Sequence, residues 1–323
     1  MPGLDGVAGS RRWSPSQMTT VALILGAALA TWIIVVIRMR GMDAGPGTDL
    51  GSLGWYVGIW VTMMAAMMLP SVAPMVLVFH RVSTERARRG QSFVPTWVFV
   101  GAYFAVWAVY GLAAFGLYRL LVHSTGGFFD WDRGGRWVAG AAIALAGVYE
   151  LTPLKSVCLK HCRSPLHYVM GSWRNGWGGA VRMGAEHGAY CVGCCWGLML
   201  VLFALGVMSL TWMIVVAALI FAQKVLPHGE VLTKAFAVAF ISIGVWVAAA
   251  PGTVPGLTLP TSDGANRARA RMMHMQPGGM QMQQSQQMQQ HGMKQQPAMK
   301  PMTTTSMQPG MTTEEQMGTG MGP

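Results

Sequence analysis

Charged residues are scarce in this sequence, and so are the signatures of a soluble enzyme. Only 11% of the 323 residues are charged, whereas a soluble globular domain carries about 25%. The chain has no HExxH zinc motif, no phosphate-binding glycine-rich loop leading into a helix, and no recognisable nucleophile–base pair. These absences give no support to hydrolysis, phosphoryl transfer or ATP-driven pumping, so we expect a protein that is not an enzyme.

The positive charge is not arranged for nucleic acid. The formal net charge is +11, but the lysines and arginines are spread between apolar runs, and no basic run alternates with aromatic residues. In membrane proteins such residues mark the cytoplasmic side. Their distribution favours an N-terminus inside and a C-terminal tail outside a bacterial cytoplasmic (inner) membrane, with the lipid bilayer as a partner.

Long apolar runs make up most of the chain. A helix needs about 20 residues to cross a bilayer, and seven runs approach or exceed that length: 20–37, 55–79, 94–121, 137–151, 190–210, 211–226 and 231–249. We predict an all-α, polytopic helical membrane bundle with about seven transmembrane helices. Its regions are a polar N-terminal segment (1–18), a helical membrane domain (19–250) and a disordered Met/Gln-rich tail (251–323).

Two of these runs carry further detail. Ala28-Leu29-Ala30 resembles a signal-peptidase site, but apolar residues continue to Ile37, so we expect an anchored, uncleaved helix. The run 137–151 is rich in glycine and alanine, which is typical of closely packed membrane helices. We therefore expect this fourth run to lie tightly against a neighbour.

All five cysteines lie between Cys158 and Cys195, in two groups. A helix would place Cys191, Cys194 and Cys195 on one face, because they are three and four residues apart. Thiolate and imidazole ligands suit zinc, copper and iron–sulfur centres. The candidate metal ligands of this stretch are Cys158, His161, Cys162, His187, Cys191, Cys194 and Cys195.

The cysteines also allow two alternatives to a metal site. Cysteines in membrane helices are often small apolar fillers, and a structural disulfide is the second alternative. The spacing matches no standard zinc finger, so zinc is not specified. His187 would extend the face of Cys191 if their helix begins early, whereas Cys158 and Cys162 are expected on a long loop between residues 153 and 190.

Methionines shift the predicted ion from zinc towards Cu(I). A thioether is a soft, neutral ligand that favours Cu(I). Met64 and Met68 fall near one face of the second run and are candidate ligands, although a methionine stripe is also common packing. The tail holds thirteen methionines from Met272 to Met321. It would capture copper outside the membrane, or it is a solvated linker.

Polar side chains at span ends carry two further expectations. Ionisable residues inside membranes are functional candidates by default. Here Glu150 and Lys224 lie near the ends of predicted spans. We expect Glu150 at the membrane interface and Lys224 to snorkel towards water, a position that needs no functional role.

Four segments carry a resemblance to a known family: MMAAMMLPSVAP (63–74), CLKHCRSP (158–165), HGAYCVGCCWGLM (187–199) and GVMSLTWM (206–213). In the same order they look like motifs of the DUF2182 family of predicted metal-binding integral membrane proteins. The family includes a bacterial membrane copper chaperone that helps load a tyrosinase-type polyphenol oxidase. The resemblance covers roughly residues 20–250 and implies copper delivery, with a copper-dependent enzyme as the recipient.

The chain departs from the family pattern at two positions. The family usually has Glu-Lys where this chain has Gln223-Lys224, and glutamine is expected where this chain has Glu150. If these positions belong to the site, its charge is redistributed here. The resulting hypothesis is a copper-binding membrane chaperone. The alternatives are a thiol-redox protein exchanging disulfides between Cys158/Cys162 and Cys191/Cys194, and a metal permease.

Overall fold

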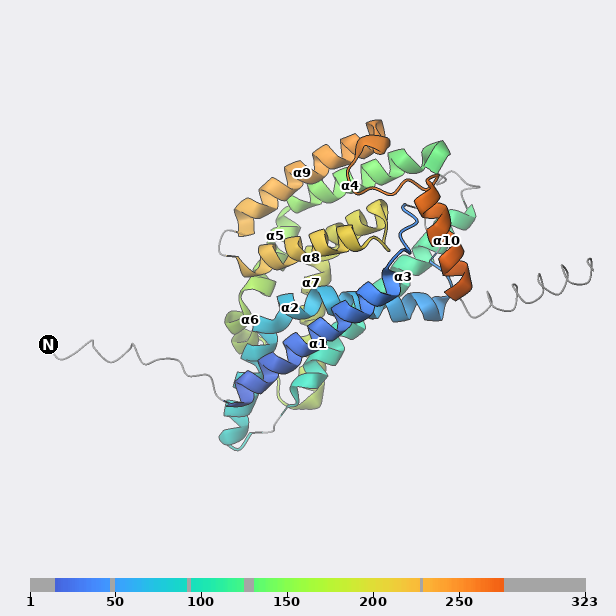
Figure 1. Cartoon of the computed structure of the whole chain (residues 1–323). Coiled ribbons are helices and arrows are strands. Elements are labelled where there is room, and N and C mark those ends of the chain that lie inside the picture. Colours follow the sequence, from blue (N-terminus) through green and yellow to red (C-terminus); the bar gives the residue numbers. More distant parts are fainter. Residues whose placement is uncertain (1–14, 47–49, 92–93, 125–130, 227–228, 276–323) are drawn as a thin grey trace, which may run out of the picture. The chain divides into compact units, whose positions relative to one another are not determined.

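The computed structural model describes residues 15–46, 50–91, 94–124, 131–226 and 229–275. Within these residues the chain forms α-helices joined by short turns, and no β-strand (Figure 1). In chain order the helices are α1 (Pro15–Met39), α2 (Leu53–Arg88), α3 (Thr96–Ser124), α4 (Arg136–Glu150), α5 (Pro153–Arg163), α6 (Pro165–Gly171), α7 (Gly176–Leu205), α8 (Leu210–Val225), α9 (Gly229–Ala249) and α10 (Asp263–Met275). A π-helical turn (Trp131–Gly135) precedes α4, and a 3-10 turn (Pro251–Thr253) follows α9.

The predicted all-α membrane bundle is confirmed, and each of the seven apolar runs corresponds to a helix, although the run 190–210 extends past the end of α7 at Leu205. Five described helices are long and apolar enough to cross a membrane: α1, α2, α3, α7 and α9. The helices α4 and α5 form a pair bent by 66°, which makes a sixth span if the pair is one unit. Helix α8 has 16 residues, fewer than the about 20 that a span needs. Length and composition therefore give five or six spans instead of about seven.

The tight packing expected of the fourth run is confirmed by its contact with α9. The two helices lie side by side (Figure 1). A Cβ atom added to Gly140 would lie 2.5 Å from the carbonyl oxygen of Gly244, and one added to Gly147 would lie 2.8 Å from that of Ala237. These glycines let the two backbones approach closely, as small residues do in membrane helix pairs.

The connection 153–190 is not the long loop expected from the sequence. Thr152 caps α5 by accepting a hydrogen bond from the Lys155 backbone N–H at 3.4 Å, and Pro153 occupies the first turn, where proline is favoured. Pro165 likewise begins α6. Helix α7 then begins at Gly176, well before the apolar run. Cys158 and Cys162 therefore lie on a helix and not on a mobile loop.

The turn between α7 and α8 depends on a glycine. Gly206 follows the last residue of α7 with φ of 118°, a conformation that side-chain-bearing residues rarely adopt. Its backbone N–H donates to the Leu202 carbonyl, and its own carbonyl accepts from the Ser209 N–H, each at 3.0 Å. This sharp turn joins α7 to α8 within four residues.

The beginning of the predicted disordered tail is folded. Residues 263–275 form α10, and Ala265, Ala268 and Met272 on it are buried. Their spacing puts them on one helical face, a pattern concealed by the polar composition of the segment. The rest of the predicted tail, and most of the predicted N-terminal segment 1–18, lie outside the described residues.

Candidate metal centre

Three thiols of α7 meet inside the protein. The sulfur atoms of Cys191, Cys194 and Cys195 all lie within 4.8 Å of one another, and the three side chains are buried. The Cys194 and Cys195 sulfurs are 3.4 Å apart. The spacing of three and four residues on a helix gives this common face, as the sequence predicted.

A fourth thiol joins them from another helix. The Cys162 sulfur on α5 lies 3.7 Å from the Cys194 sulfur, and the Cys194 thiol also lies 3.3 Å from the Cys191 carbonyl oxygen. We call these four side chains the thiol cluster. Cys162 is only half-buried, whereas the α7 thiols are fully enclosed. The cluster thus brings together sulfur ligands from both cysteine groups of the sequence.

Cys158 lies apart from the three enclosed thiols, although it is also buried. It is one helical turn before Cys162 on α5 and packs against Gly193 of α7. A Cβ atom added to Gly193 would lie 2.7 Å from the Cys158 sulfur. Gly193 therefore allows α5 to approach α7 closely enough for Cys162 to reach the cluster.

His187 is buried and lies on α7 one turn before Cys191. The helix begins at Gly176, early enough to include both residues. Its ring packs against Tyr168 at 5.4 Å, Tyr103 at 5.8 Å and Phe99 at 6.0 Å between ring centroids. Its Nδ1 atom has no hydrogen-bond partner among the described residues, and a buried polar atom without a partner is rare in native proteins. The imidazole keeps a free ligand position beside the thiols.

One of the aromatic residues that pack against His187, Tyr168, lies on α6 outside the apolar spans. Tyr168 on the short helix α6 donates a hydrogen bond from its hydroxyl to the Met183 carbonyl at 2.8 Å. Burial raises the pKa of the Tyr168 phenol well above its ordinary value. The phenol therefore stays protonated and remains a donor, which anchors α6 against α7.

His161 is half-buried and is held by its own neighbours. Its ring stacks on Tyr190, with centroids 4.2 Å apart and planes 4° apart. Its Nδ1 lies 2.9 Å from the Val157 carbonyl oxygen, which can only accept, so Nδ1 carries the proton. Nε2 is left as the atom with ligand capacity.

Two residues that the sequence did not assign to the site complete the surroundings of Cys191. The Lys224 Nζ atom donates to the Cys191 sulfur at 2.9 Å, and the Tyr103 hydroxyl lies 2.9 Å from the same atom. Lys224 is buried, so the expectation that it snorkels to water is wrong. The general rule that a charge inside a span is a functional candidate had pointed to Lys224, and its place at the end of the span led to the opposite expectation.

Glu150 is also buried, which overturns its expected place at the membrane interface. It is 2% exposed and forms an ion pair with Lys155, whose Nζ lies 2.5 Å from Glu150 Oε1. Lys155 Nζ also donates to Gln223 Oε1 at 3.0 Å, and Gln223 Nε2 donates to Glu150 Oε2 at 2.8 Å. We call these three residues the ion triad.

The ion triad accounts for the two departures from the family pattern. Glu150 and Gln223 are the positions where a carboxylate and an amide have exchanged places relative to the DUF2182 motifs, and here they are hydrogen-bonded to each other. Because both contact Lys155, the exchange keeps one carboxylate beside the same cation. The charge is moved across a single contact and is not lost.

Met64 and Met68 are fully buried in α2, within the same apolar core as the α7 thiols. The Met68 sulfur lies 4.0 Å from the Ser71 hydroxyl. A methionine is buried both when it only packs in the core and when it serves as a metal ligand. Burial therefore does not distinguish the two roles, and the role of Met64 and Met68 as ligands stays a prediction.

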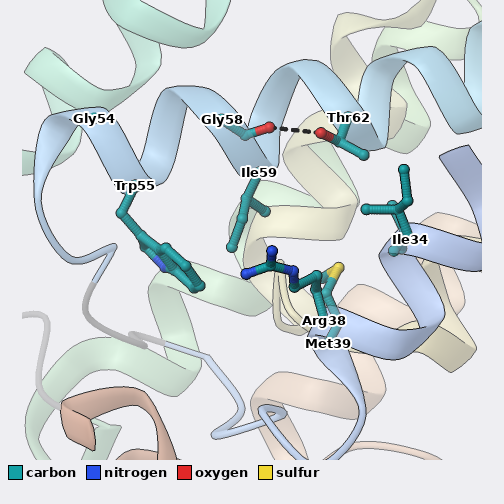
Figure 2. Close-up of a pocket in the computed structure, with 9 residues that line it drawn as sticks. Ile34, Arg38, Met39, Gly54, Trp55, Gly58, Ile59 and Thr62 are labelled. Carbon is teal, nitrogen blue, oxygen red and sulfur yellow. Dashed lines mark hydrogen bonds between the residues drawn. The ribbon is translucent and has the colours of Figure 1, made fainter. Parts of the chain in front are cut away.

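A separate cavity lies between α1 and α2, with a volume of about 250 Å³. Figure 2 shows it lined by Arg38, Trp55 and Ile59, with the Thr62 hydroxyl donating to the Gly58 carbonyl at 2.7 Å. Met39 supplies the one sulfur of its lining, which has no thiol or imidazole. Its ligand chemistry does not suit a soft metal, so we place the candidate centre at the thiol cluster.

Comparison with known proteins gives one match. The model of a family described as PpoB2, copper chaperone, matches residues 57–247, which is more than half of the chain and includes all five cysteines. No curated protein and no solved structure matches the chain.

Proposed function

Since the chain belongs to the PpoB2 copper chaperone family, we propose that it binds Cu(I) in the membrane at the thiol cluster and passes it to a copper-dependent enzyme. The observation that carries the proposal is the convergence of four sulfurs from α5 and α7. Thiolates are among the softest ligands that proteins offer, and they select Cu(I) or zinc. Copper is the cargo, so this activity is delivery and not catalysis.

Copper is favoured over zinc by the surroundings of the cluster. A structural zinc site has four ligands in a closed tetrahedron, whereas Cys191 here already accepts contacts from Lys224 and Tyr103. The ammonium group of Lys224 offsets one thiolate charge, and the smaller negative charge that remains on the cluster suits a monovalent ion better than a divalent one. The buried methionines of α2 add soft, uncharged donors to the same core.

The difference in burial among the thiols suggests a route for the ion. Cys162 is half-buried, and Cys191, Cys194 and Cys195 are enclosed. We assign Cys162 to the first and last contact with copper, and the α7 thiols to holding it. His187, one helical turn before Cys191 and with no described hydrogen-bond partner for its Nδ1, is an additional candidate ligand. His161 and Cys158 form an outer set on α5.

The proposal extends to the membrane and to the methionines. The lysine and arginine distribution supports a bacterial inner membrane with the N-terminus inside, which puts α5 on the inner side. Met64 and Met68 would relay copper through the bundle from a methionine-rich tail outside. Met64→Leu with Met68→Leu tests this relay, because copper transfer that is unchanged in the double variant removes the thioethers from the route.

The central test measures Cu(I) affinity on the purified protein with a competing chromophoric chelator. We expect one Cu(I) per chain. Replacing Cys191, Cys194 and Cys195 together by serine should weaken binding at least about a hundredfold, because loss of outer partners alone costs 10- to 100-fold. Cys158→Ser removes a thiol outside the cluster and should have a much smaller effect. Affinity that survives the triple change would refute the site.

A thiol-redox function is the second candidate, and one distance favours it. The 3.7 Å between the Cys162 and Cys194 sulfurs is short enough for a disulfide to form with little movement of the backbone. The two thiols come one from each of the groups, Cys158/Cys162 and Cys191/Cys194, between which the sequence analysis considered disulfide exchange. Redox cycling of Cys162 and Cys194 with a dithiol in metal-free protein, without stoichiometric Cu(I) binding, would favour this function over the chaperone.

A further inference from the structure

A second cavity, larger than the one between α1 and α2, lies outside the thiol cluster, at the bend between α4 and α5. Its volume is about 590 Å³. Residues of the bend form one side, including Leu151 and Ser156, and the first turns of α9 form the other, including Val231 and Lys234. The 66° angle between α4 and α5 opens this space against α9. Neither the family match nor the thiol chemistry gives it a role.

The lining of this cavity is strongly cationic. Lys155, Lys160, Arg163 and Lys234 face it, together with one carboxylate, Glu150. Lys155 and Gln223 already hold both oxygens of that carboxylate. The charge that the cavity offers to a ligand is therefore positive. A cavity of low dielectric strengthens the attraction of this charge for an anion compared with an open surface.

The cations of the cavity differ in how firmly they are held. Arg163 donates to the backbone carbonyls of Gln223 and Leu226 at 3.2 and 2.6 Å, so its guanidinium is fixed at the C-terminal end of α8. Lys160 and Lys234 are exposed, and neither has an ion-pair or hydrogen-bond partner among the described residues. Two exposed ammonium groups beside a fixed guanidinium form a suitable site for an anion with several oxygen atoms.

The rim of the cavity is apolar and uncovered. Leu151 is 55% exposed and Val231 is 65% exposed, and both line the cavity. Leu154 and Val157, on the neighbouring turns of α5, are also exposed. Exposed aliphatic side chains at the end of a membrane helix contact lipid chains. Positive charge inside the cavity and apolar surface at its edge therefore match the two halves of an anionic lipid.

We propose that this cavity binds the phosphate headgroup of an anionic phospholipid. Lys160 and Lys234 would contact the phosphate oxygens, Arg163 would supply the fixed positive wall, and the acyl chains would lie along Leu151 and Val231. Basic pockets between membrane helices bind such headgroups by this chemistry. Free phosphate shares the recognition of the headgroup but gains nothing from the apolar rim, so the lipid is the better occupant.

The test uses the full chain, purified in a neutral detergent, with native mass spectrometry as the measurement. The probes are short-chain phosphatidylglycerol, phosphatidylcholine of the same chain length, and inorganic phosphate. We expect one saturable phosphatidylglycerol per chain. Lys160→Gln with Lys234→Gln should weaken phosphatidylglycerol binding at least about tenfold, since each lysine near an anionic headgroup contributes to the binding free energy.

A matched control removes the same charge elsewhere. Arg81→Gln with Arg88→Gln changes two exposed cations of α2 that are not part of the cavity lining, and should leave the affinity within about twofold. Competition by millimolar inorganic phosphate supports headgroup recognition. Equal binding of phosphatidylcholine, equal loss in the control, or binding of phosphate without phosphatidylglycerol would each overturn the proposal. Both double variants should keep Cu(I) affinity, which shows that they are folded.

Discussion

The thiol cluster and the ion triad are adjacent, buried and polar, yet they differ in how their polar atoms are satisfied. Adjacent residues of α8 face each of them: Gln223 is part of the triad and Lys224 contacts Cys191. In the triad, both oxygens of Glu150 are hydrogen-bonded, and one carboxylate offsets one ammonium group. In the cluster, one ammonium group faces several sulfurs, and His187 Nδ1 is without a described partner.

This difference separates a structural role from a binding role. A buried charge pair whose hydrogen bonds are complete has no capacity left for a ligand, and its loss leaves an uncompensated charge. A set of soft donors without that internal completion keeps its capacity for a metal ion. We therefore expect changes in the triad to act on stability, and changes in the thiol cluster to act on copper affinity.

The largest expected effect comes from breaking the triad. Lys155→Met leaves the Glu150 carboxylate buried without its cation, and should lower the free energy of unfolding by about 3–5 kcal/mol. The measurement is thermal or denaturant unfolding of the detergent-solubilised protein. A fall of less than about 1 kcal/mol would show that the triad does not carry this role.

Exchange of the two partners sharpens the same point. Glu150→Gln combined with Gln223→Glu keeps a carboxylate and an amide beside Lys155, in reversed positions, as in the DUF2182 pattern. The double variant should be more stable than either single change, since the coupling of contacting residues reaches about 0.5–3 kcal/mol. If the change in unfolding free energy of the double variant equals the sum of the two single changes, Glu150 and Gln223 do not compensate for each other and the prediction is wrong.

A smaller effect is expected at the contact between α5 and α7. Gly193→Ala places a methyl group 2.7 Å from the Cys158 sulfur, and overpacking of this kind costs about 1–3 kcal/mol. Moving α5 away also withdraws Cys162 from the cluster, so Cu(I) affinity should fall together with stability.

Gly178→Ala is the matched control on the same helix. A Cβ atom there meets nothing within 4 Å, and alanine in place of glycine in a helix gains about 0.5–1 kcal/mol. If both alanine variants bind copper as the parent does, Cys162 is not a required ligand.

The sequence predicts the helices well because membrane spans are set by local composition. Apolar runs located α1, α2, α3, α4, α7, α8 and α9 but not the more polar α5, α6 and α10. The small residues around Gly140 indicated a tight contact without identifying α9 as the partner. The face shared by Cys191, Cys194 and Cys195 follows from helical spacing alone. Each of these features depends on residues that are close in the chain.

The contacts between distant segments could not be obtained in this way. Cys162 meets Cys194 only because α5 packs on α7, and Lys224 turns inward only because α8 places it beside Cys191. Composition indicated a loop around Cys162 and a snorkelling Lys224, since nothing local shows which neighbour will satisfy a polar group. The same reason applies to Glu150, whose partner Gln223 lies 73 residues further along the chain.

Lys224→Met gives the most direct comparison with Lys155→Met, because the same substitution is made in the two neighbouring clusters. Loss of Lys224 leaves thiols that can hold their protons and become neutral, so no buried charge is left unpaired. Stability should therefore change by about 1 kcal/mol or less, far below the effect at Lys155. The copper-loaded cluster would lose the cation that offsets its thiolates, and Cu(I) affinity should fall about tenfold, equivalent to about 1.4 kcal/mol. Chelator competition and unfolding, measured on both lysine variants, decide the matter: a Lys224→Met protein as unstable as Lys155→Met, with unchanged copper affinity, would make the thiol cluster a structural element like the triad.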